Sequence, residues 1–280
     1  MLKLGDYNLL PLVALDDKGG WLAAEPYGEL FIPKRQLSAQ SQVGDEVRVF
    51  LYLDADLAPV ITTASPKACA GQFACLKVVD SNRLGAFLDW GMKKDIFVPE
   101  RNQAHPMEIG YDYVVYVYLD HEGRMVASSK IDSFLASPPA DMRPGQAVEL
   151  LIAEPTQLGF KAIVDGQYGG LLYRSDLSRS LPVGFTTSGY IKQVRFDNKI
   201  DLTLFKSGPG TVDEATETVF AQLIQAGGFM PVNDKTDPDT LFRLFSISKG
   251  TFKKAIGGLY KQGRIVIESD GIRTTKQNDQ

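Results

Sequence analysis

The 280-residue sequence contains few of the residues that build metal centres, disulfide frameworks or acid–base catalysts. It has two cysteines and two histidines. Cys69 and Cys75 have a spacing that fits neither a disulfide framework nor a Cys-x-x-Cys motif, so we expect both to be reduced. His105 and His121 lie in loop-like sequence. With only two histidines and this cysteine spacing, the sequence lacks the side chains for a structural zinc site or for histidine-based acid–base catalysis. We therefore expect no metal and no cofactor.

Long apolar runs are missing as well. No stretch approaches the roughly 20 consecutive apolar residues that a membrane-spanning helix needs. In the first residues, MLKLGDYNLLPLVALDD, aspartates interrupt the apolar run before it reaches the length of the apolar region of a secretory signal peptide. These observations predict a cytoplasmic protein that does not contact membranes.

Motifs that would indicate catalysis are lacking. No Walker lysine motif and no dinucleotide-binding glycine pattern occurs. The tetrapeptide SISK at residues 246–249 has Ser-x-x-Lys spacing, but Ser248 is better explained as a helix cap. We therefore expect that the protein is not an enzyme.

The net charge of −4 is unevenly distributed along the chain. Residues 1–66 carry 5 Lys and Arg against 9 Asp and Glu, whereas residues 213–280 carry 9 of each. We expect a polyanion to be repelled by the first segment and tolerated further along the chain.

An internal repeat is the clearest feature that is present. VGDEVRVFLYLD at 43–54 is nearly repeated by IGYDYVVYVYLD at 109–120, and ELFIPKRQL at 29–37 aligns with DIFVPERNQ at 95–103. A more divergent third copy includes GGLLYRSDL at 169–177. Alternating apolar runs between Gly, Asp and Asn are typical of strands and hairpins, and a period of roughly 65 to 75 residues suits a small closed barrel.

Segments rich in Pro, Gly, Ala and Ser separate the copies. They are TTASPKACAG at 62–71, ASPPADMRPG at 136–145 and KSGPG at 206–210. Such segments end strands and form linkers. The domains that they predict are residues 1–66, 67–140, 141–210 and 211–280.

The last segment changes to a helical period. DEATETVFAQLIQAGG, starting at Asp213, and SKGTFKKAIGGLYKQG each place apolar residues on one helical face. DPDTLFRLFS begins with Asp237 as an N-cap and Pro238 at the first helical position. RIVIESDGIRTT predicts a hairpin through Asp270-Gly271. Three helices and a two-stranded wing indicate a winged helix-turn-helix domain.

Short motifs indicate which small barrel is present, since composition alone does not separate an OB-fold from an SH3-like barrel. A Gly-aromatic second strand, a GLL or IFVP third strand, and a final hairpin before IDLTL or VASSK resemble the RNA-binding domain of ribosomal protein S1. With GAFLDWG, VVYVYLD, ASSKID and GFKAIVDGQYGGLLY in this order, the chain resembles the bacterial conserved virulence factor B family.

The resemblance implies a fold and a role. The fold is mainly β, with three tandem OB-fold, S1-like five-stranded barrels followed by an α+β winged helix-turn-helix domain. The role is RNA binding and regulation without a catalytic centre.

Candidate RNA contacts follow from how OB barrels bind single strands, which is by stacking bases on rings and placing cations near phosphates. Alternation along GAFLDW puts Phe87 on the face opposite Trp90, which would then help to fill the barrel. For any single ring, a place in the core remains the alternative. The residues expected to contact RNA are Phe87, Phe97, Arg124, Lys161, Tyr173, Lys192, Arg195, Lys199, Lys249, Lys253 and Lys254.

Three functions remain open at this point. The first is an RNA-binding regulator of gene expression that contacts single-stranded RNA through the second and third barrels and the winged helix. The second is an adaptor that docks on the ribosome, RNA polymerase or a nuclease. The third is a DNA-binding transcription factor, which is disfavoured because the last predicted helix offers only Gln262 for base readout. The acidic first copy, with Trp21 and Phe31, is predicted to be a structural or docking barrel.

Overall fold

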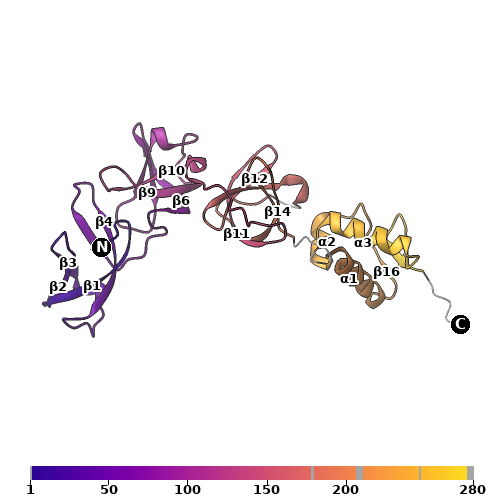
Figure 1. Cartoon of the computed structure of the whole chain (residues 1–280), viewed down its shortest axis with the longest axis horizontal. Coiled ribbons are helices and arrows are strands. Elements are labelled where there is room, and N and C mark those ends of the chain that lie inside the picture. Colours follow the sequence, from indigo (N-terminus) through magenta and orange to yellow (C-terminus); the bar gives the residue numbers. More distant parts are fainter. Residues whose placement is uncertain (1, 178–179, 206–210, 246, 276–280) are drawn as a thin grey trace. The chain divides into compact units, whose positions relative to one another are not determined.

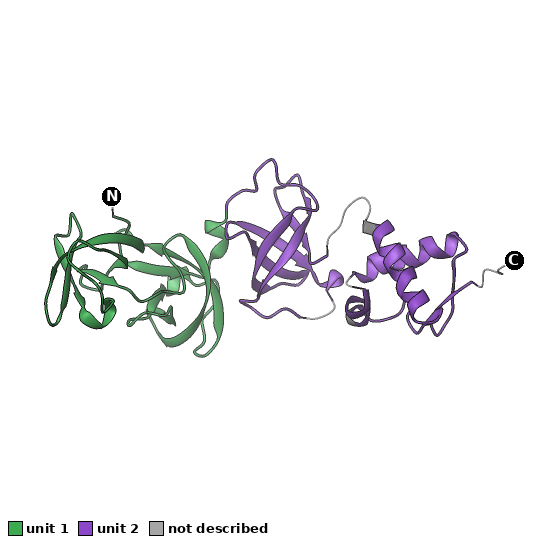
Figure 2. Ribbon diagram, turned by 90° about the horizontal axis from the view of Figure 1, so that it is seen from below, with its two compact units in different colours: residues 1–135 green, residues 136–280 purple. Residues whose placement is uncertain are grey.

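The computed structural model describes residues 2–177, 180–205, 211–245 and 247–275. Strands dominate, and helices are concentrated near the carboxyl end (Figure 1). The chain divides into two compact units, residues 1–135 and 136–280 (Figure 2). The four domain limits given above stay a prediction. Within the described residues, no helix is both long and apolar enough to cross a membrane.

The first five strands form an antiparallel sheet with the order β3-β2-β1-β4-β5. They are β1 (Asp6–Leu15), β2 (Gly19–Ala23), β3 (Glu29–Pro33), β4 (Glu46–Leu53) and β5 (Pro59–Thr62). The edge strands β3 and β5 lie side by side. Gln36 Oε1, just after β3, accepts hydrogen bonds from Thr62 Oγ1 and the Thr63 amide, each at 2.9 Å. A side chain therefore links the two edges of this first barrel.

The second and third sheets are closed barrels. The second consists of β6 (Gln72–Asn82), β7 (Gly85–Asp89), β8 (Ile96–Pro99), β9 (Asp112–Leu119) and β10 (Met125–Ser128). The third consists of β11 (Ala147–Pro155), β12 (Gly159–Val164), β13 (Tyr168–Tyr173), β14 (Thr186–Val194) and β15 (Ile200–Thr203). Parallel pairing of β10 with β8 and of β15 with β13 closes each barrel. The predicted mainly β architecture of three five-stranded barrels is confirmed.

A short 3-10 turn follows the third strand of each barrel, and another follows the last strand of the second barrel. The turns are η1 (Lys34–Gln36), η2 (Glu100–Asn102), η3 (Ile131–Phe134) and η4 (Arg174–Asp176).

A glycine opens the second strand of every barrel for a steric reason. A Cβ atom on Gly19, Gly85 or Gly159 would lie 2.1, 2.2 or 1.9 Å from a carbonyl oxygen of the facing strand. Such distances are far below van der Waals contact, so only glycine allows the two strands to approach this closely. This requirement explains the Gly-aromatic motif of the sequence.

The repeated strand β4 buries both of its faces. Val49 and Leu51 belong to the core of the first barrel, whereas Phe50 points the other way and is nevertheless 0% exposed. Trp90 of the second barrel lies with its ring centroid 5.9 Å from Phe50 and 6.0 Å from Tyr52. The first two barrels therefore share a core, which explains why they form one compact unit.

The segment between these two barrels is held in place. The amide of Lys67 donates to the Trp90 carbonyl and the amide of Ala70 donates to the Gly5 carbonyl, both at 2.8 Å. Trp90 is buried as predicted, but the prediction that it fills its own barrel was incomplete, because its ring also packs on the first barrel.

The strand β9, which repeats the sequence pattern of β4, is covered by a different element. Tyr116 and Tyr118 occupy the positions that Phe50 and Tyr52 hold in β4. The ring of Phe134, from η3, stacks on Tyr116 at a centroid distance of 4.3 Å. The same sequence pattern is thus covered by the next barrel in one copy and by a 3-10 turn in the other.

The carboxyl-terminal domain has the predicted three helices and wing. Its elements are α1 (Thr211–Gln225), β16 (Phe229–Met230), α2 (Pro238–Phe245), α3 (Lys249–Lys261), β17 (Ile265–Ile267) and β18 (Ile272–Thr274). Asp237 Oδ1 caps α2 by accepting the Thr240 amide at 2.8 Å, and Ser248 Oγ caps α3 by accepting the Thr251 amide at 3.1 Å. Both predicted caps are confirmed, and β16 adds a third strand that was not predicted.

Two features discussed from the sequence lie outside the described residues. They are the predicted linker at 206–210 and Ser246 of the SISK tetrapeptide.

Candidate nucleic-acid interface

Two aromatic rings face outward from the second barrel. Phe87 of β7 and Phe97 of β8 stand opposite each other in the strand register, with ring centroids 5.0 Å apart. Both are half-buried, whereas their neighbours Ala86 and Leu88 are fully buried. The alternation expected from the sequence therefore places this pair on the outer surface, where a base can stack.

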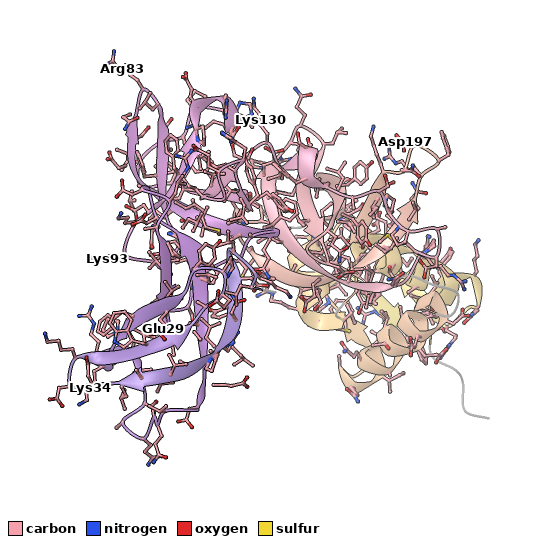
Figure 3. The ribbon with its side chains drawn as sticks, turned by 60° about the vertical axis from the view of Figure 1, so that its left-hand side comes forward. Glu29, Lys34, Arg83, Lys93, Lys130 and Asp197 are labelled. Atoms are coloured by element: carbon pink, nitrogen blue, oxygen red, sulfur yellow. The ribbon has the colours of Figure 1, made fainter. Side chains whose placement is uncertain are left out.

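The Phe87–Phe97 pair lines a cavity of about 800 Å³ in the first compact unit. This volume lies inside the roughly 300–1,000 Å³ typical of small-ligand sites. Four basic side chains line its wall: Lys93 and Lys94 from the loop between β7 and β8, Arg101 of η2, and Arg124 of the β9–β10 hairpin. The carboxylates of Asp54, Asp95 and Asp120 line it as well. Figure 3 shows Lys93 projecting between the first barrel, where Glu29 and Lys34 are labelled, and the turn of the second barrel that carries Arg83. We call this space the aromatic cavity.

Three of the basic side chains that line the aromatic cavity have no carboxylate within ion-pairing distance in the described part of the chain. Among the residues that the structure describes, Lys93, Lys94 and Arg101 form no side-chain ion pair, and all three are exposed. A cation without a carboxylate partner is free to approach a phosphate. The cavity therefore combines a ring surface for bases with charge for a sugar-phosphate backbone.

Arg124 lines the same cavity but is compensated by carboxylates. Its guanidinium pairs with Asp120 at 2.9 Å and also with Glu122. Partial burial raises the pKa of Asp120, but hydrogen bonds from the amide and guanidinium of Arg124 outweigh it, so this pKa lies below its usual value. Asp120 is therefore ionised at neutral pH. A contact between Arg124 and RNA stays a prediction.

The third barrel replaces the ring pair with other side chains. In its register Lys161 stands opposite Leu171, at the positions that Phe87 and Phe97 hold in the second barrel. Lys161 Nζ pairs with Glu154, its neighbour across the strands, at 3.1 Å. This barrel offers no equivalent aromatic pair at these positions, as the sequence suggested.

Tyr173 and Arg195 meet at a nearly buried carboxylate in the third barrel. The hydroxyl of Tyr173 donates to Asp201 Oδ1 at 3.1 Å, and Arg195 Nη2 lies 2.9 Å from the same oxygen. Arg195 also donates to the Tyr173 hydroxyl. Burial raises the pKa of Asp201, but the hydrogen bonds from Arg195, Gln193 and Tyr173 outweigh it and the pKa is lowered.

The two remaining predicted lysines of the third barrel also have acidic partners. Lys192 Nζ lies 2.7 Å from Asp176 and 5.7 Å from the centre of the Tyr173 ring. Lys199 Nζ lies 3.2 Å from Asp197. The structure thus brings Lys192, Tyr173 and Arg195 together, and carboxylates offset the cations. These residues stay predicted RNA contacts.

Replacing Asp201 by asparagine should destabilise the third barrel at neutral pH, because charge-assisted hydrogen bonds contribute about 1.5–3 kcal/mol. The lowered pKa of folded Asp201 means that its contribution is complete above the unfolded pKa of about 3.9 and is lost as pH falls through the folded value. The gap in unfolding free energy between the chain and Asp201→Asn should therefore narrow from pH 7 to pH 3. Urea unfolding at both pH values measures it, and a gap independent of pH would contradict this assignment.

The predicted lysines of the winged helix lie in the first half of α3. Lys249 Nζ donates to the Lys235 carbonyl at 3.2 Å, and Lys253 lies 4.0 Å from Asp234. Lys254 is exposed, and no partner is found for its side chain within the described part of the chain. Their contact with nucleic acid stays a prediction.

Sequence reasoning missed three basic residues that line the aromatic cavity. It did not single out Lys93, Lys94 or Arg101, although the adjacent lysines just before the Phe97 strand were a visible signal. The structural or docking role predicted for the first barrel stays a prediction. Its Trp21 and Phe31 rings face each other on β2 and β3 at 5.2 Å and are 38% and 39% exposed. They hold the same register in the first barrel as Phe87 and Phe97 hold in the second.

The described residues contain no group of His, Cys, Asp and Glu that could hold a metal ion. Cys69 and Cys75 are free thiols, as predicted, and burial raises the pKa of each.

Comparison with known proteins identifies the domains. Residues 4–64 and 70–130 match the S1 domain, and they coincide with the first and second barrels. Residues 217–273 match the CvfB-like winged helix domain. Two S1 domains followed by a CvfB-like winged helix domain make the chain similar to the conserved virulence factor B proteins. Both kinds of matched domain point to nucleic-acid binding, and neither is an enzyme domain.

Several relatives align over most of the chain. The conserved virulence factor B of Staphylococcus saprophyticus is 22% identical and covers 98% of this chain and 95% of its own length. The protein of the same name from Staphylococcus aureus is 23% identical over 84% of this chain and 81% of its own. Uncharacterized protein YitL of Bacillus subtilis is 24% identical over 89% and 87%.

A solved structure also aligns along the chain. It is described as a multidomain protein with nucleic acid binding domains from Streptococcus pneumoniae, and it is 22% identical with a TM-score of 0.43. The alignment covers 97% of this chain and 98% of that one.

Proposed function

We propose that this protein is a non-catalytic RNA-binding regulator of gene expression that binds single-stranded RNA. The main contact is the aromatic cavity of the second barrel. The third barrel and the winged helix add further contacts. Partners in the transcription, translation or RNA-decay machinery would receive the bound RNA.

One observation carries the proposal, namely the outward Phe87–Phe97 pair beside three cations without carboxylate partners. Unpaired bases stack on aromatic rings irrespective of their sequence, because every base has a π-face. Paired bases inside a duplex cannot reach the rings. The site therefore favours single strands and weak sequence preference.

Ion pairing distinguishes the second barrel from the third. In the third barrel Lys161, Lys192, Arg195 and Lys199 each have a carboxylate partner, which an RNA phosphate would have to displace. The second barrel needs no such exchange at Lys93, Lys94 or Arg101. We therefore assign the larger share of the affinity to the second barrel.

The exposed surface of α3 supports a phosphate contact rather than base readout. Its exposed side chains include Lys253 and Lys254, and α3 contains no Arg, Asn or Gln. Asn and Gln read adenine in the major groove, and Arg or Lys reads guanine, so α3 lacks the side chains that read adenine. The winged helix would thus add affinity with little sequence choice.

Fluorescence anisotropy with a labelled decauridylate RNA and with duplex DNA tests this function. We expect micromolar affinity for the RNA at low salt and weaker binding of the duplex. Three phosphate contacts predict a slope of about −2 for log affinity against log salt, since each contributes roughly 0.7 on a single strand. Failure to bind the RNA below about 100 µM at low salt would reject the proposal, because one stacked base, at about 1–3 kcal/mol, and three neutralised phosphates together should give micromolar affinity.

A further inference from the structure

The first barrel supplies one wall of the aromatic cavity. The end of β4 and the turn that follows it, from Tyr52 to Ala55, line the cavity opposite residues of the second barrel. The S1 match divides the two barrels into separate domains. The cavity therefore extends across a domain boundary but lies inside one compact unit.

Contacts between two hairpins hold this wall in position. Leu53 at the end of β4 forms an isolated parallel bridge with Arg124 of the β9–β10 hairpin. A Cβ atom on Gly123, in that hairpin, would lie 3.1 Å from Leu53 Cδ1, so the two hairpins are in close contact. A larger residue than glycine would press the hairpins apart.

The core that the first two barrels share also holds the Tyr52–Ala55 wall in position. Tyr52 lines the cavity and also packs edge-on against Trp90, which is 3% exposed. The indole Nε1 of Trp90 donates to the Lys94 carbonyl at 2.6 Å. One buried ring therefore positions both the first-barrel wall and the loop that carries the cavity's lysines.

The turn at the tip of the wall is ordered by its own hydrogen bonds. Asp54 Oδ1 accepts the amides of Asp56 and Ala58 at 2.9 and 3.0 Å. Ala55 lines the cavity, whereas Ala58, in the same turn, does not. The two alanines are both exposed, and they provide a matched pair of positions for mutation.

We propose that the first and second barrels form one composite nucleotide site. A single base of the RNA stacks on the Phe87–Phe97 pair, and the Tyr52–Ala55 wall of the first barrel encloses it. The composite site rests on the proposed RNA binding. It adds that the acidic first barrel, which carries 5 basic against 9 acidic residues, contributes by shape rather than by charge.

Filling the cavity from the first-barrel side tests the composite site. Ala55→Trp in the full chain places an indole at the wall, and Ala58→Trp makes the same change outside the cavity. We expect Ala55→Trp to weaken binding of the labelled decauridylate about tenfold or more, equivalent to the loss of one stacked base. Ala58→Trp should change the affinity by less than about twofold, because an exposed substitution of this kind has an effect within about 0.5 kcal/mol.

The outcomes separate this proposal from the proposed function. If Phe87→Ala/Phe97→Ala weakens binding and Ala55→Trp does not, the composite site is wrong and RNA binding by the second barrel stands. If neither variant changes the affinity, RNA binds elsewhere and both proposals are wrong at this cavity.

Two further measurements test the composite site even if the Ala55→Trp variant does not fold. If Ala55→Trp unfolds, the pair Ala55→Glu and Ala58→Glu repeats it by charge repulsion instead of bulk. Photocrosslinking of the unmodified chain to an oligonucleotide containing 4-thiouridine should label peptides from both the 52–58 turn and the β7–β8 region. Label confined to the second barrel would overturn the composite site.

Discussion

Replacing both Phe87 and Phe97 by alanine is expected to weaken binding of single-stranded RNA by about 10- to 100-fold. The two rings form the stacking surface of the aromatic cavity, and base–aromatic stacking contributes about 1–3 kcal/mol per base. The fold should survive, since the cross-strand ring pair contributes only about 0.5–1.5 kcal/mol beyond its burial. Anisotropy titration with the decauridylate measures the change.

The first barrel provides the matched control. Trp21→Ala/Phe31→Ala removes a ring pair at the same strand register, and these two rings are more exposed than Phe87 and Phe97. This pair lies in the acidic segment and does not line the aromatic cavity, so we expect less than about a threefold loss of affinity. Equal losses in the two double variants would show that any exposed ring pair suffices, and would contradict the assignment to the second barrel.

Trp90→Ala is expected to destabilise the first compact unit by about 3–5 kcal/mol, the usual cost of removing a fully packed aromatic side chain. Trp90 contacts Phe50 and Tyr52 across the two barrels, and its loss leaves a cavity in a core that both barrels share. The two barrels should lose stability together. Urea unfolding followed by far-UV circular dichroism measures the effect.

The only other tryptophan is the control for this prediction. Trp21 is 38% exposed on the outer face of β2, and Trp21→Ala should cost about 1 kcal/mol or less. A loss confined to the second barrel on Trp90→Ala, seen by hydrogen exchange of β4 amides that stay protected, would show that the shared core does not couple the barrels.

The sequence by itself determined the elements and their order. Alternating apolar residues and helix caps such as Asp237 and Ser248 act within a few residues of chain, and local steric rules read them directly. The two-residue period of a strand placed Phe87 and Trp90 on opposite faces but left open which face is the outer one. These features needed no knowledge of distant neighbours.

Only the tertiary structure decided which surfaces are covered. The strands at 43–54 and 109–120 are nearly identical in pattern, yet Phe50 is buried by Trp90 of the next barrel, whereas Tyr116 is half-buried under Phe134 of a 3-10 turn. Ion pairing also depends on the tertiary structure. Lys93 and Lys192 look alike in sequence, but Lys192 pairs with Asp176, whereas Lys93 has no carboxylate partner among the described residues. Because burial and pairing depend on residues far apart in the chain, the cavity between the first two barrels could be found only from their packing.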